Sequence, residues 1–158
     1  MKGINDMHYY GINFNDFVDS IYSTTVAKQI KHLLFEVLAS DKELTKQIDN
    51  ANQYFDAHDM DVNVKTAKIN DQIILLIDKP FDTVDTNDEQ VEAATKVLQL
   101  TIFNIAWYAY LQQYGDENIA NNDHTKLTEK EDRYLAALTN VLHVNFDQLK
   151  LVKIYNFK

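Results

Sequence analysis

The stretch DVNVKTAKINDQIILLID, residues 61–78, decides the fold, because its hydrophobic pattern has the period of two that is typical of β-strands. Residues 61–69 mix apolar and polar side chains, as a strand with one solvent-facing side does. Residues 72–78 are apolar on both faces, which favours a central strand with a neighbour on each side. Asn70-Asp71 fits a two-residue turn between them. The sequence therefore predicts an antiparallel hairpin.

The central strand of that hairpin needs a second neighbour, and two segments are candidates. Residues 149–157 (LKLVKIYNF) alternate between apolar residues and lysines, as edge strands often do. Residues 7–12 (MHYYGI) are a candidate for a further strand. We expect a small antiparallel sheet made of the hairpin 61–69/72–78 and the C-terminal strand 149–157.

Helix start signals surround this sheet. A hydroxyl residue followed three positions later by Glu forms a capping box, in which each side chain binds the other residue's backbone N–H. The motif occurs at Ser40/Glu43, Thr86/Glu89 and Thr128/Glu131. Each copy precedes apolar residues at helical spacing, and the first of these helices runs from Asp41 to near His58. An earlier helical pattern covers roughly 14–39, where Ser23-Thr24-Thr25 is a possible break.

Together these elements predict an α+β protein with about four helices, one of them long and central, packed on the small sheet. Only 3 glycines and 1 proline occur, which favours long continuous elements. A length of 158 residues suits one globular domain, and no linker or repeat divides the chain, so residues 1–158 are expected to form a single domain.

The long helix contains the most apolar stretch, TIFNIAWYAYLQQYG, residues 101–115. The chain carries no charge from Val97 to Gly115, close to the length of a membrane span. Polar residues interrupt it, however, and no Lys/Arg cluster flanks it. The interrupting residues are Gln99, Thr101, Asn104, Gln112 and Gln113. We therefore expect a helix inside the protein and no contact with a membrane.

This helix is apolar on two opposite sides. One is an aliphatic face that runs from Val91 to Ala109, and the other is an aromatic stripe formed by Phe103, Trp107, Tyr110 and Tyr114. The preferred interpretation buries both sides in the core and predicts that Trp107→Ala costs roughly 3–5 kcal/mol of stability. The alternative leaves the stripe partly exposed to bind a partner, because Trp and Tyr are enriched at binding hot spots.

Composition narrows the function classes. The net charge is −9, with 24 acidic against 15 basic residues, and Arg133 is the only arginine. Because such a surface repels phosphates and has only one copy of the side chain best suited to bind them, no direct nucleic-acid binding is expected. The absence of Cys excludes disulfides and thiolate chemistry. The opening MKGINDMHYY has no apolar leader, which favours a cytoplasmic location.

His58-Asp59 resembles the metal-binding His-Asp pair of the HD phosphohydrolases, with His32 and Asp123 or Asp132 as further candidate ligands. The rest of that family's pattern is absent. We therefore interpret His58 as a residue at a helix C-terminus and Asp59 as a turn residue. The sequence also lacks a Gly-x-Ser-x-Gly elbow and a glycine-rich phosphate loop. No catalytic residue, metal or cofactor is expected, although enzymatic activity is left open.

Residues 78–92 hold six acidic residues against one lysine. They lack the glycine and the ligand spacing of a calcium loop, so they form either a solvated helix start or a surface for a basic partner. The sequence thus favours a small acidic protein-interaction module, such as a phage-type inhibitor that occupies the basic groove of a nucleic-acid enzyme. The candidate partner-binding residues are Asp82, Asp85, Asp88, Glu92, Asp116, Glu117, Trp107, Tyr110 and Tyr114. The alternatives are a small-ligand-binding protein or hydrolase with a pocket between helices and sheet; homo-oligomerisation is compatible with either.

Overall fold

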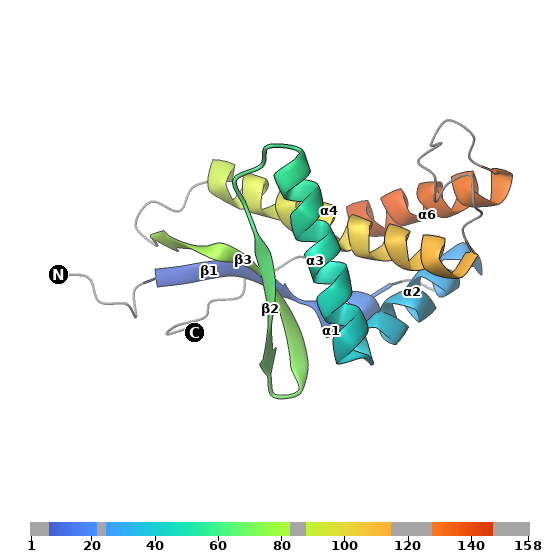
Figure 1. Ribbon diagram of the computed structural model, residues 1–158, viewed down its shortest axis with the longest axis horizontal. Helices are drawn as coiled ribbons and strands as arrows, with labels where there is room; N and C mark the ends of the chain where they lie inside the picture. The colour runs from blue at the N-terminus through green and yellow to red at the C-terminus, as the bar shows by residue number, and fades with distance from the viewer. Residues whose placement is uncertain (1–6, 22–24, 83–87, 115–127, 147–158) are drawn as a thin grey trace.

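The computed structural model describes residues 7–21, 25–82, 88–114 and 128–146. Within these ranges, five helices pack on a three-stranded antiparallel sheet, which confirms the α+β prediction (Figure 1). The elements are β1 (Met7–Asn13), α1 (Phe14–Asp19), α2 (Thr25–Leu38), α3 (Asp41–Ala57), β2 (Val64–Ile69), β3 (Gln72–Asp82), α4 (Asp88–Tyr114) and α6 (Glu129–Phe146).

The predicted hairpin is present as β2 and β3. Ile69 pairs with Gln72, and Asn70 and Asp71 both have positive φ, 51° and 63°, as a type I′ turn requires. The order of the sheet is β1-β3-β2, so the strand that is apolar on both faces is central, as predicted. It extends to Asp82, four residues further than the sequence indicated.

The second neighbour of the central strand is β1, which the sequence offered only as a candidate for a further strand. It pairs antiparallel with β3, and the register shifts between Tyr9 and Gly11. Gly11 lies opposite Leu76, and a Cβ at position 11 would meet the backbone oxygen of Leu75 at 2.6 Å. The close approach of β1 to β3 therefore requires glycine here. The predicted strand 149–157 lies outside the described residues.

The outer edge of β2 is closed by a side chain from α3. The amide of Asn52 donates to the carbonyl of Val64 (3.0 Å) and accepts from its N–H (2.8 Å), as a neighbouring strand would. This contact fixes where β2 meets α3, and β2 begins at Val64, later than the predicted residue 61.

Two helices occupy the range 14–39, where the sequence predicted one helical pattern with a possible break. Asn13 caps α1 by accepting from the N–H of Asp16 (3.0 Å), and α1 ends at Asp19. The second helix, α2, begins at Thr25, the last residue of the run that suggested an interruption. By contrast, α3 spans Asp41–Ala57 with Ser40 as its N-cap, as predicted.

The long helix α4 is central, as predicted. It contacts α2, α3, α6 and β3, and Figure 1 shows it running behind α3, with α6 lying alongside its C-terminal part. Its aliphatic face is buried at Ala94, Leu98, Ile102, Ile105 and Ala109. None of the helices in the described part of the chain is long and apolar enough to cross a membrane.

Candidate functional site

A cluster of aromatic rings joins α4 to α6. Tyr110 on α4 is 1% exposed, and its ring stacks on that of Tyr134 on α6 with centroids 4.0 Å apart. The hydroxyl of Tyr134 donates to the carbonyl of Ala106 (2.9 Å). Trp107 lies beside both tyrosines, with centroid distances of 5.9 and 6.1 Å. The two helices are thus fixed relative to each other at this point.

The N-terminus of α6 places a carboxylate next to this ring cluster. Glu131 accepts from the N–H of Thr128 (3.0 Å), and the Thr128 hydroxyl accepts from the N–H of Glu131 (3.2 Å), so the predicted capping box is complete. Glu131 is only 4% exposed. Burial raises the pKa of Tyr110, and the negative charge of Glu131 raises it further. The Tyr110 phenol therefore stays protonated at neutral pH.

Burial also raises the pKa of Tyr134, and this predicts a loss of stability in alkali. A phenol whose pKa is higher in the folded state contributes its full stability below the unfolded value of about 10, and loses it as pH rises toward the folded value. We expect Tyr134→Phe to reduce the fall of the free energy of unfolding above about pH 10. Denaturant titrations of wild type, Tyr134→Phe and the exposed control Tyr114→Phe measure this. The prediction would be contradicted if the free energy of unfolding fell equally with pH in wild type and in Tyr134→Phe.

The residues of the predicted aromatic stripe differ in how deeply they are buried. Tyr110 belongs to the core, Phe103 and Trp107 are half-buried, and Tyr114 is 42% exposed. Near the C-terminus of α4, four apolar or aromatic residues are at least partly exposed, and Leu111 lies three or four positions from each of the other three. We call Trp107, Tyr108, Leu111 and Tyr114 the aromatic patch. Side chains at this spacing are neighbours on a helix surface, so the patch is continuous.

The acidic candidates are only partly described. Glu92 is exposed on α4, with its carboxylate 3.8 Å from Lys96 Nζ. Asp82 ends β3 and Asp88 begins α4. The remaining candidates, Asp85, Asp116 and Glu117, lie outside the described residues. The predicted acidic surface therefore stays a prediction.

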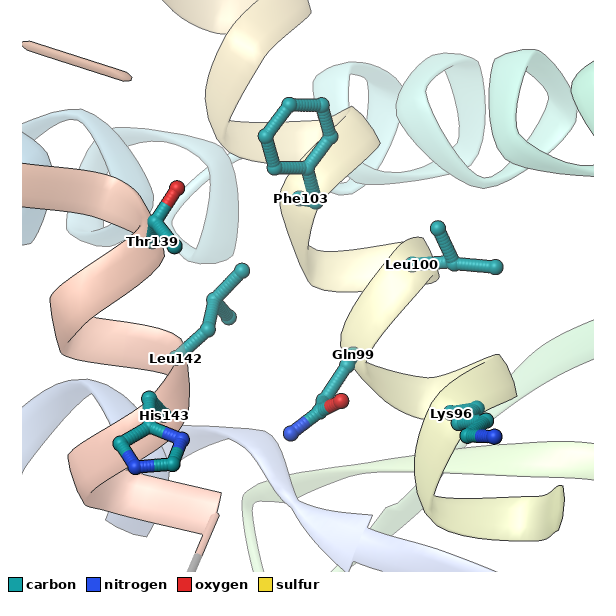
Figure 2. Close-up of a pocket in the computed structure, with 7 residues that line it drawn as sticks. All are labelled: Lys96, Gln99, Leu100, Phe103, Thr139, Leu142 and His143. Carbon is teal, nitrogen blue, oxygen red and sulfur yellow. The ribbon is translucent and has the colours of Figure 1, made fainter. Parts of the chain in front are cut away.

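A cleft of about 440 Å³ lies between α4 and α6, on the N-terminal side of the aromatic patch. Figure 2 shows its lining side chains, which come from both helices. They are Lys96, Gln99, Leu100 and Phe103 from α4, and Thr139, Leu142 and His143 from α6. The sequence did not predict this site. The spacing of the four α4 residues places them on one face of the helix. No sequence pattern near them indicates that α6 covers only part of that face.

The His-Asp pair has the structural role that was predicted for it. His58 is the C-cap of α3, its Nδ1–H donates to the carbonyl of Tyr54 (2.8 Å), and its ring stacks on that of Tyr54. Asp59 adopts a positive φ of 55° in the following turn. His32 pairs instead with Glu36 (2.9 Å). Across the described ranges, no group of three or more His, Asp or Glu residues is arranged to hold a metal ion.

Compared with known proteins, the chain matches no family model, no curated protein and no solved structure.

Proposed function

We propose that this protein is an interaction module that binds a basic protein partner through the aromatic patch and the acidic residues around it. The observation that carries this proposal is the exposure of large rings on a helix whose other side forms part of the core. Tyr108 and Tyr114 are 38% and 42% exposed. Tyr108 lies among the α4 residues that contribute to the core, and Tyr114 lies four residues after the last buried one of them, Tyr110.

Aromatic rings at such a position are suited to binding. Tyr and Trp provide a large contact area with few rotatable bonds, and they are enriched among the residues that dominate binding energy. The stack of Tyr110 on Tyr134 also holds α4 rigidly against α6. A partner would therefore meet a surface whose backbone is already ordered, which reduces the entropic cost of association.

Charge favours a basic partner. The Lys130 ammonium lies 5.3 Å from the Tyr114 ring centroid, which places the first turn of α6 next to the aromatic patch. That turn also carries the exposed acids Glu129 and Asp132. The net charge of −9 attracts a cationic surface at long range. A groove that normally accepts nucleic acid is one such surface, because carboxylates can take the place of phosphates there.

A quantitative capture experiment tests this proposal. Three immobilised proteins are compared for the proteins that they capture from a cell lysate at low and high salt. They are the wild type, the double variant Tyr108→Ala/Tyr114→Ala and the control Phe35→Ala. Phe35 is 38% exposed on α2, so the control removes an equally exposed ring from another helix. We expect a basic protein that binds wild type and control alike, is lost with the double variant, and is released by salt.

The captured protein is then purified and its affinity for the three proteins is measured. Retention by the double variant, or an affinity independent of salt, would overturn the proposal. Sedimentation of the wild type alone tests a further outcome. Self-association that the double variant abolishes would assign the aromatic patch to a second copy of this chain.

A further inference from the structure

We propose that the cleft between α4 and α6 binds a small apolar carboxylate, for which a medium-chain fatty acid is the model. This site shares no residue with the aromatic patch and goes beyond the proposed interaction with a protein. Its volume of about 440 Å³ falls within the range of roughly 300–1,000 Å³ that small-molecule sites occupy.

The cleft has one polar and one apolar end. Lys96, Gln99 and His143 lie at the end formed by the N-terminal part of α4 and the C-terminal part of α6 (Figure 2). Leu142 points from α6 toward α4, and Phe103 lies at the opposite end. Such an arrangement fits an elongated molecule with a polar head and an apolar body.

Thr139 does not disturb this division, although it is polar and lines the cleft. Its hydroxyl donates to the carbonyl of Leu135 (2.9 Å), so its proton is already used within α6. The remaining hydrogen-bond donors are therefore the ammonium of Lys96, the amide of Gln99 and the imidazole N–H of His143. All three are at the same end.

These groups select a negatively charged head. None of the seven described lining residues is acidic, in a chain whose net charge is −9. Lys96 does have a carboxylate neighbour, Glu92, but the atoms are 3.8 Å apart and both side chains are more than two-thirds exposed. A pair so exposed to water is weak, so the ammonium can still bind a ligand.

The charge and length of the cleft indicate which anion it takes. A single lysine without arginine matches a monoanionic carboxylate better than a phosphate, whose recognition favours several donors and bidentate guanidinium groups. Lys96 and Phe103 are separated by about two helical turns, roughly 10 Å along α4. An extended alkyl carboxylate of medium length spans that distance.

Titration with decanoate, below its micellar concentration, tests the proposal. Calorimetry measures its affinity, and decanol and decyltrimethylammonium are titrated as neutral and cationic probes of the same length. We expect saturable binding of one decanoate, with weaker binding of both other probes. Saturable binding of the cationic probe in the cleft that is as tight as that of decanoate would overturn the proposal, because the polar end would then not select a negative charge. Absence of saturable decanoate binding would overturn it as well.

Two variants locate the site. Thr139→Phe places a ring in the cleft from an exposed position and should abolish binding. Lys96→Met should weaken decanoate binding roughly tenfold, while Lys28→Met, an exposed lysine on α2, should not change it. Equal effects of the two lysine variants would contradict the assignment. The double variant Tyr108→Ala/Tyr114→Ala should bind decanoate normally, so that failure of this site and failure of the protein-binding site are distinguishable.

Discussion

Tyr110→Ala is expected to lower the free energy of unfolding by about 3–5 kcal/mol, as truncations of large buried side chains do. The side chain is 1% exposed and its ring stacks on Tyr134 at 4.0 Å. Removing it leaves a cavity between α4 and α6, and it also removes a ring contact of Trp107. Chemical denaturation measures the loss. A fall of less than about 1 kcal/mol would mean that the α4–α6 contact contributes little to stability.

Trp107→Ala is the matched comparison, because it removes a larger ring one turn away on the same helix. The sequence alone predicted a loss of roughly 3–5 kcal/mol if Trp107 is a core residue. Trp107 is half-buried, so less of its area leaves water on folding, and we expect a loss of about 1–3 kcal/mol. An equal loss in the two variants would show that Trp107 is as important to the core as Tyr110.

Gly11→Ala is expected to destabilise the protein by about 1–3 kcal/mol, the usual cost of overpacking. The added Cβ would lie 2.6 Å from both the Leu75 backbone oxygen and Leu76 Cδ2. The leucine side chain can move, but the backbone oxygen belongs to the central strand, so β1 must move away from β3. Amide hydrogen exchange should therefore become faster in β1, while the β2–β3 hairpin keeps its protection.

Thr66→Ala on β2 provides the control for Gly11→Ala, since it changes a half-buried strand residue without adding an atom. It should leave the exchange of β1 unchanged. A melting temperature of Gly11→Ala equal to that of wild type would contradict the close packing of β1 on β3.

The elements that the sequence predicted well are those specified by neighbouring residues. The hairpin follows from a turn pair flanked by residues of period two, and α3 follows from the Ser40 cap and a regular apolar face. The pairing of β1 with β3 was not predictable in the same way. It joins residues 61 to 75 positions apart and depends on a bulge and on Gly11, neither of which has a local signature.

The candidate site shows the same limit. The aromatic stripe was recognisable from helical spacing, because all its members lie on α4. Which members become buried depends on where α6 packs: Tyr134 stacks on the buried Tyr110, whereas Tyr114 is exposed. The cleft likewise joins Gln99 to His143, two residues whose proximity only the packing of the helices creates.

The hydrogen bonds of Asn52 have a consequence for behaviour at high concentration. In the described sheet β2 is an edge strand, and an open edge can template the addition of strands from other molecules and so begin aggregation. The Asn52 amide already binds both the N–H and the C=O of Val64, so an incoming chain finds this position taken. Further along the edge, Lys68 is exposed. If a second copy added its own β2 to this edge, the two Lys68 charges would come close together and repel each other. One α3 side chain thus helps to keep the sheet from growing beyond the molecule.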